Sequence, residues 1–193
     1  MSQNAFNYPG NIVVISGPSG AGKGTLIQQL CTTYFPHAKL AISATTRSPR
    51  VGEINHTSYH FLNESSFQRS IQNNDFLEWC LVHEHYYGTL TSELSPALSP
   101  DGLVLLEIDV QGAKKIKEKI PSVVTIFIAP PDMATLKERL LLRNTDTRET
   151  IEKRLVIAQK EMASQNWYDY VMINNTVEES IRLLTTFISH HFR

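Results

Sequence analysis

The chain has 193 residues, with 18 Lys and Arg against 19 Asp and Glu, and 41% of its residues are hydrophobic. This is the composition of an ordinary globular domain, and the net charge of −1 argues against a protein that coats nucleic acid. No apolar run approaches the roughly 20 residues of a membrane span, and the first ten residues have no secretory pattern. We therefore expect a cytoplasmic protein with reduced cysteines, no nucleic-acid or membrane partner and no obligatory protein partner.

Strand-length apolar runs alternate with helical patterns along most of the chain. Residues Asn11–Ser16 form a β-branched run, and helical spacing follows over residues 25–34. Such an alternation predicts a parallel sheet covered by helices on both faces. Further strands are expected at residues 103–109, 123–129 and 170–173, and further helices at residues 112–120, 132–143, 149–165 and 177–190.

The glycine-rich segment after the first predicted strand is the strongest local signal. Its residues are Gly17, Pro18, Ser19, Gly20, Ala21, Gly22, Lys23, Gly24 and Thr25. Glycines let backbone amides surround a phosphate chain, the following helix start favours an anion, and Lys23 can reach the β and γ phosphates. The alternative, a tight turn that binds nothing, does not account for Lys23 in this context. The usual pattern has Ser or Thr directly after the lysine, whereas this chain has Gly24, so we expect Mg²⁺ to stay largely hydrated.

Residues 43–90 differ in character from the rest of the chain. They are rich in Ser, Thr, Asn, His and aromatic residues, with short alternating runs near 59–61 and 78–82 and one helical pattern at 65–73. We interpret them as a small mixed α/β lobe inserted into a core made of residues 11–42 and 91–193. The polar residues 144–148 separate two Arg-bearing helices and predict a lid at about 139–154, all within a single domain of residues 1–193.

Charged residues of this lobe and of the 103–109 strand are typical of a nucleotide site. Arg47 and Arg50 lie three residues apart, and guanidinium groups pair with phosphate through two hydrogen bonds. Glu78 could accept hydrogen bonds from the N1–H and the 2-amino group of guanine. Glu107 and Asp109 would point to the same side of a strand, at the end where α/β sheets bind ligands, so we expect them to face the metal through water.

Together these segments resemble the guanylate kinase family. The blocks that carry the resemblance are TTRSPRVGE (45–53), FLEW (76–79), YYGT (86–89), LEID (106–109) and IAPP (128–131), and they run in order along nearly the whole chain. The resemblance implies a P-loop NTPase-type fold and the transfer of the γ-phosphate of ATP to GMP, with Mg²⁺. This sequence departs from the family pattern at Gly24, Thr89, Glu107 and Asn144.

The resemblance also implies a role for each matching residue. In the acceptor lobe, Ser43, Glu78 and Thr89 would read guanine, whereas Arg47, Arg50, Tyr59 and Tyr87 would hold the acceptor phosphate. Asp109 would face the metal and the acceptor. Catalysis would rest on Lys23 with the lid arginines Arg139, Arg143 and Arg154, and Asn174 would contact the donor adenine.

Two other function classes remain open at this point. One is a different monophosphate kinase, against which Glu78 and residues 43–50 argue. The other is a non-enzymatic guanylate-kinase-like interaction domain, against which the intact loop with Lys23 argues. A run of four lysines, Lys114, Lys115, Lys117 and Lys119, is interpreted as a solvated helix face rather than a nucleic-acid contact.

Overall fold

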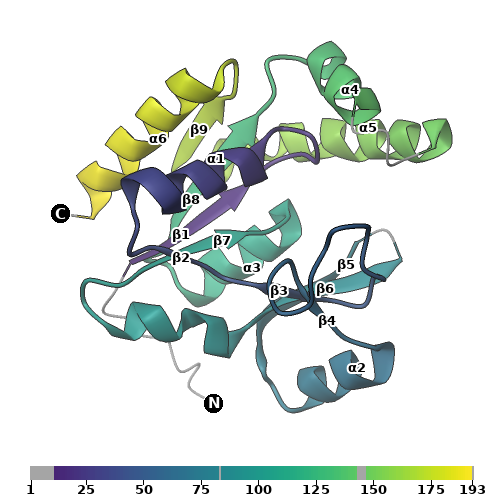
Figure 1. Cartoon of the computed structure of the whole chain (residues 1–193), viewed down its shortest axis with the longest axis vertical. Helices are drawn as coiled ribbons and strands as arrows, with labels where there is room; N and C mark the ends of the chain where they lie inside the picture. The colour runs from purple at the N-terminus through teal and green to yellow at the C-terminus, as the bar shows by residue number, and fades with distance from the viewer. Residues whose placement is uncertain (1–10, 83, 143–146, 193) are drawn as a thin grey trace.

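The computed structural model of the chain describes residues 11–82, 84–142 and 147–192 (Figure 1). Arg143, Asn144 and the first ten residues, for which no secretory pattern is expected, lie outside these ranges. The described strands form two sheets, one of five strands and one of four. Within the described residues, no helix has both the length and the apolar character needed to cross a membrane.

The larger sheet is parallel, with the order β2-β7-β1-β8-β9. Its strands are β1 (Asn11–Ser16), β2 (Lys39–Leu40), β7 (Leu103–Glu107), β8 (Val124–Ala129) and β9 (Tyr170–Ile173). The helices between them are α1 (Lys23–Gln29), extended by the π-helical turn η1 (Leu30–Tyr34), α3 (Val110–Lys119), α4 (Met133–Leu142), α5 (Arg148–Ala163) and α6 (Val177–His191). Two 3₁₀ segments, η2 (Thr91–Leu98) and η3 (Gln165–Trp167), complete the core.

Both faces of this sheet are buried, as the alternation of strands and helices predicted. In β1, Val13 and Ile15 face a cluster that includes Leu26 of α1 and Leu184 of α6. Val14, which points the other way, belongs to a second cluster with α3 and η2. Figure 1 shows α1 and α6 lying together, with α3 between the sheet and the smaller lobe. The expected α/β class is therefore confirmed.

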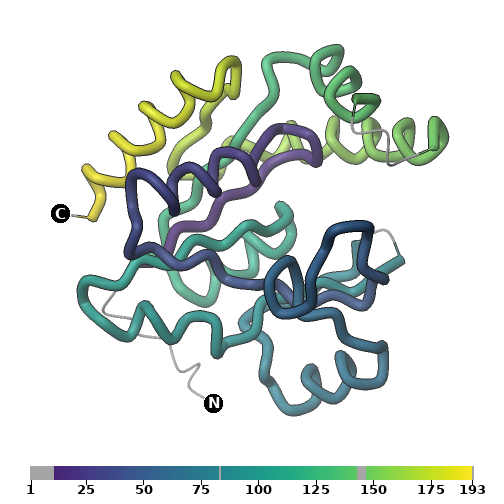
Figure 2. Tube along the Cα trace, in the orientation of Figure 1, coloured from purple at the N-terminus to yellow at the C-terminus, as the bar shows by residue number. Residues whose placement is uncertain are grey.

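The smaller sheet has the order β4-β3-β6-β5 and mixes parallel and antiparallel pairs. Its strands are β3 (Ser43–Thr45), β4 (His60–Phe61), β5 (Phe76–Val82) and β6 (His85–Leu90), and α2 (Glu64–Gln72) packs on it. Phe67 of α2 joins Ala44 and Phe76 in a small cluster separate from the two clusters of the core. The chain trace in Figure 2 shows this lobe beside the core.

The two chain segments that connect the lobe to the core are joined by one carboxylate. Glu93 of η2 accepts a hydrogen bond from the Ile42 backbone N–H at 2.9 Å, just before β3 begins. Its other oxygen lies 2.9 Å from Nε2 of His60 in β4. Glu93 therefore links η2, the β2–β3 connection and β4 at the boundary of the lobe.

The structure corrects one of our expectations and adds contacts to another. The strand expected at 103–109 ends at Glu107, because Asp109 caps α3 by accepting hydrogen bonds from the backbone N–H groups of Gln111 and Gly112 at 2.6 and 2.9 Å. The predicted solvated lysine face is confirmed for Lys114, Lys115 and Lys119, which are exposed, whereas Lys117 is partly buried. Three of the lysines also make contacts that the sequence did not indicate: Lys117 forms an ion pair with Asp169 at 2.9 Å, and Lys115 and Lys119 donate hydrogen bonds to backbone carbonyls of β5.

Candidate active site

A cleft of about 330 Å³ joins the loop after β1 to the smaller sheet. Fifteen of the predicted site residues line it: Gly17, Ser19, Gly20, Gly22, Lys23, Gly24, Ser43, Arg47, Arg50, Tyr59, Glu78, Tyr87, Glu107, Asp109 and Arg154. Six other predicted site residues that the structure describes do not line the cleft: Pro18, Ala21, Thr25, Thr89, Arg139 and Asn174. Arg143 lies outside the described residues.

The loop between β1 and α1 is shaped by glycines and by Lys23. Gly17 has a φ of 136°, and a Cβ there would stand 2.1 Å from the Ile128 carbonyl oxygen, so no larger residue fits. The Lys23 ammonium donates to the carbonyl oxygens of Gly17 and Pro18 at 2.7 and 3.1 Å, so the loop curls around this charge. The α1 N-terminus follows directly at Gly22, which places a helix dipole at the same point.

Asn174 supports the loop from beneath. Its side chain is buried at 4% exposure, its amide N–H donates to the Ala21 carbonyl at 2.7 Å, and its amide oxygen accepts from Ser180 at 2.8 Å. Arg139 donates to the Asn174 carbonyl at 3.0 Å. Both residues thus contact the base of the loop, and the contact of Asn174 with adenine stays a prediction. Arg154 reaches the loop from α5, where it lies 3.3 Å from the Ser19 hydroxyl.

Two carboxylates lie beside the loop at the end of β7. A Cβ added to Gly24 would stand 3.8 Å from Oε2 of Glu107, so the missing side chain leaves space in front of this carboxylate. Oδ2 of Asp109 accepts a hydrogen bond from the Cys80 thiol at 2.8 Å. Burial and the nearby Asp109 charge raise the pKa of Cys80, so the thiol keeps the proton that it donates. Cys80 also lines the cleft, a position that its sequence context did not indicate.

The far end of the cleft is formed by three adjacent strands. Ser43 of β3 and Glu78 of β5 both pair with Thr89 of β6, so the three residues predicted to read guanine are neighbours. Oε1 of Glu78 accepts hydrogen bonds from the Thr89 backbone N–H at 3.0 Å and the Thr89 hydroxyl at 2.9 Å. Oε2 is buried and has no hydrogen-bond partner among the described residues. Burial raises the pKa of Glu78 to about 7, with Asp109 adding to the rise and Thr89 opposing it.

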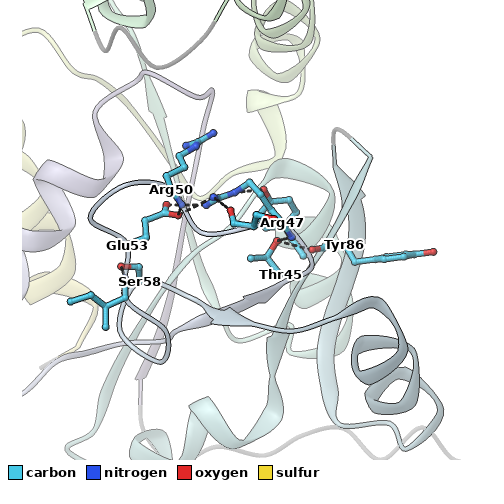
Figure 3. Close-up of polar contacts among 9 residues, drawn as sticks. Thr45, Arg47, Arg50, Glu53, Ser58 and Tyr86 are labelled. Atoms are coloured by element: carbon cyan, nitrogen blue, oxygen red, sulfur yellow. Dashed lines mark hydrogen bonds and ion pairs between the residues drawn. The ribbon is translucent and has the colours of Figure 1, made fainter.

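The predicted phosphate-binding side chains gather around Arg47. Its guanidinium forms a two-pronged ion pair with Glu53, with both N···O distances at 2.9 Å (Figure 3). Its Nε donates to the Tyr87 hydroxyl at 3.2 Å, and its charge lies 5.3 Å from the centre of the Tyr59 ring. Glu53 also accepts from the Arg50 backbone N–H at 2.7 Å, which shapes the loop that carries both arginines.

Sequence reasoning missed two acidic residues of this site. Glu53 lies in the TTRSPRVGE block, where the pattern assigns it no role, although a carboxylate six residues after Arg47 is able to form a local ion pair. Glu161 of α5 lines the cleft, and burial raises its pKa to about 7 while the Lys23 ammonium opposes the rise. Nothing in the pattern of α5 distinguished Glu161 from the other polar residues of that helix.

One end of the cleft holds a phosphate loop with a lysine, and the other end holds a lobe with a paired arginine and a buried carboxylate. This combination defines a P-loop nucleotide-binding phosphotransferase. The guanylate kinase family model matches residues 9–191. The chain therefore belongs to the guanylate kinase family, whose members are ATP:GMP phosphotransferases.

Individual relatives agree with this assignment. The chain is 44% identical over 179 residues to the guanylate kinase of Helicobacter pylori strain J99, covering 93% of this chain and 86% of the relative. It is 45% identical over 179 residues to the guanylate kinase of Caldanaerobacter subterraneus, with the same two shares. The crystal structure of guanylate kinase from Anaplasma phagocytophilum is similar with a TM-score of 0.78 at 28% identity, covering 98% of this chain and 89% of that chain.

Proposed function

We propose that the cleft transfers the γ-phosphate of ATP to GMP, giving ADP and GDP, with ATP at the phosphate loop and GMP on the smaller lobe. The observation that carries the acceptor assignment is the buried Oε2 of Glu78, which lacks a partner among the described residues. Guanine presents two donors side by side, N1–H and the 2-amino group, that suit such an oxygen. Adenine presents an acceptor at N1 and would leave the carboxylate unpaired.

On the donor side, Lys23 and the amides of the loop would bind the β and γ phosphates of ATP. Arg139, Arg143 and Arg154 belong to the proposed lid at about 139–154, and they would close over the transferred group. Support comes from Arg139 and Arg154, which already contact the loop or its base. Closing the lid and the lobe would exclude water and so limit wasteful hydrolysis of ATP.

On the acceptor side, Ser43, Glu78 and Thr89 would bind guanine, and Arg47, Arg50, Tyr59 and Tyr87 would bind the phosphate. The attacking oxygen belongs to a phosphate that is largely ionised near neutral pH, so the reaction needs no strong general base. Catalysis then comes from positioning the two nucleotides in line and from stabilising the charge of the transferred group.

Mg²⁺ fits the residues beside the loop. Glu107 and Asp109 supply the oxygen ligands that this cation prefers and both line the cleft, and Gly24 puts no side chain in front of Glu107. Both carboxylates would hold the cation through its water. When bound, the cation would neutralise charge on the phosphates of ATP. Membership of the family suits an enzyme of purine nucleotide metabolism. The two free thiols of this chain, Cys31 and Cys80, suit a cytoplasmic location.

A coupled assay of ADP release tests this proposal. The purified chain is supplied with ATP, Mg²⁺ and one acceptor at a time: GMP, AMP, UMP or CMP. We expect GMP to be preferred over AMP by roughly 10⁴–10⁵ in kcat/KM, because a site with a buried polar partner rejects an analogue that lacks the matching group. Comparable use of AMP would refute the acceptor assignment, and a non-enzymatic interaction domain would release no ADP with any of the four.

A further inference from the structure

Helix α3 lies against the outer edge of β5, the strand that carries Glu78. β5 is an edge strand of the small sheet, so no strand of the described ranges pairs with one side of its backbone. Two lysines of α3 occupy that side: the Lys115 ammonium donates to the Trp79 carbonyl, and the Lys119 ammonium donates to the Leu77 carbonyl. These two carbonyls flank Glu78 in the chain.

The spacing of the two elements matches. Lys115 and Lys119 are four residues apart on a helix, which places them on one face about 6 Å apart along the axis. In a regular strand, carbonyls two residues apart lie about 6.7 Å apart on the same side. Leu77 lies at a register shift between Phe76 and Glu78, yet its carbonyl and that of Trp79 both accept from α3. The lysine ammonium of Lys115 also lies 5.3 Å from the centre of the Trp79 ring. One face of α3 therefore takes the place of a neighbouring strand.

The first turn of α3 also meets the Glu78 side chain. A Cβ added to Gly112 would stand 2.8 Å from Oε2 of Glu78, so the helix backbone borders the oxygen that is left unpaired. The other oxygen is held by Thr89 of β6. The carboxylate thus sits between β6 and α3, and the distance between α3 and β5 decides where Oε2 points.

We propose that Lys115 and Lys119 are positioning residues for guanine recognition, because they hold the edge of β5 against α3 and thereby fix the Glu78 carboxylate. The proposal rests on the guanine-reading role of Glu78 proposed above. Leu77 supports the same arrangement, since its side chain is fully buried in the cluster that contains Ile116 of α3. The two lysines act through Glu78 and touch neither nucleotide.

Lys115 also contributes charge to the site. The groups that act on Glu78 are Thr89 of β6, Asp109 at the start of α3 and Lys115. Burial raises the pKa of Glu78, Asp109 raises it further, and the Lys115 ammonium opposes both. Removing that ammonium therefore moves the pKa of Glu78 upward. A purely structural role of Lys115, in which it only holds the lobe against α3, would not produce this shift.

The test replaces each lysine by methionine, which keeps most of the length, and by arginine, which keeps the charge and the donors. For the Lys115→Met, Lys119→Met double variant we expect KM for GMP to rise roughly tenfold, because both lysines are exposed to solvent and act on guanine only through Glu78, with KM for ATP unchanged. The arginine variants should recover GMP binding. In Lys115→Met, the pH at which GMP binding is half-maximal should move upward, as followed by calorimetry.

Lys114→Met is the matched control, since Lys114 is an exposed lysine of the same helix. Within the described residues it forms no hydrogen bond or ion pair. Thermal unfolding of every variant shows whether the fold is kept. Unchanged GMP kinetics, or equal losses for GMP and ATP without rescue by arginine, would overturn the positioning role. If Glu78→Gln also left GMP kinetics unchanged, the guanine-reading role proposed above for Glu78 would fail; if only the lysine variants behaved as the wild type, this inference alone would fail.

Discussion

Replacing Glu78 by glutamine tests the acceptor site at its most selective point. The amide oxygen of the new side chain can take over the hydrogen bonds that Oε1 accepts from Thr89 at 3.0 and 2.9 Å. The NH₂ group must then occupy the place of Oε2, where two donors of guanine need an acceptor. Hydrogen bonds to a charged group contribute about 1.5–3 kcal/mol each, so losing two costs about 3–6 kcal/mol. That loss corresponds to roughly 10²- to 10⁴-fold in kcat/KM for GMP.

The same change should stabilise the folded protein above neutral pH. Burial raises the pKa of Glu78 from its ordinary value of 4.5 to about 7. Between these values the unfolded chain loses the proton while the folded chain keeps it, so wild-type stability falls as the pH rises through this window. We expect Glu78→Gln to exceed the wild type by up to about 3 kcal/mol at pH 8, and the difference to vanish near pH 4.5.

Three measurements check this reasoning: steady-state kinetics with GMP and AMP, calorimetric titration of ATP, and urea unfolding at both pH values. ATP affinity should stay unchanged, because the phosphate loop lies at the opposite end of the cleft. Glu118→Gln is the control, since Glu118 is an exposed residue of α3 that undergoes the same chemical change. GMP kinetics that match those of the wild type would refute the guanine-reading role, and lower stability at pH 8 would refute the burial argument.

Three further changes probe the rest of the cleft. Lys23→Met should lower kcat roughly 10²- to 10³-fold with the melting temperature kept, and turnover within a few-fold of the wild type would contradict the phosphate-loop assignment. Gly24→Ser should be tolerated, because the added Cβ stands 3.8 Å from Glu107; excess EDTA should still abolish activity and Mg²⁺ restore it, whereas full turnover without a divalent cation would refute the metal site. Glu53→Gln should raise KM for GMP roughly tenfold, because it weakens the two-pronged ion pair with Arg47, while KM for ATP should stay unchanged.

The elements that followed from periodicity are those with at least four residues and one face turned to the core. The strand at Tyr170–Ile173 has its predicted bounds, and the predicted helix at 177–190 differs from α6 by one residue, because each buries one clear face against the same cluster. The strands β2, β3 and β4 have two or three residues, too few to show a period of two. Asp109 was placed in a strand because the apolar run reaches Ile108, but a carboxylate that can cap a helix competes with continued strand pairing.

The candidate site divides in a similar way. Lys23 and its glycines are local, so their loop followed from neighbouring residues alone. The partners of Lys115 and Lys119 are carbonyls more than thirty residues away in the chain, and a backbone carbonyl carries no signature in sequence. For the same reason the contact between Cys80 and Asp109 depends on how α3 packs against β5, which no local pattern specifies.

The small lobe has a hydrophobic cluster of its own, made of Ala44, Phe67 and Phe76. This cluster is far smaller than either cluster that packs on the parallel sheet, so we expect the lobe to open at a lower free energy than that sheet and its amides to exchange with solvent first. A nucleotide that binds only the closed lobe suppresses this opening by mass action. We therefore expect GMP to slow amide exchange in the lobe more than in the core.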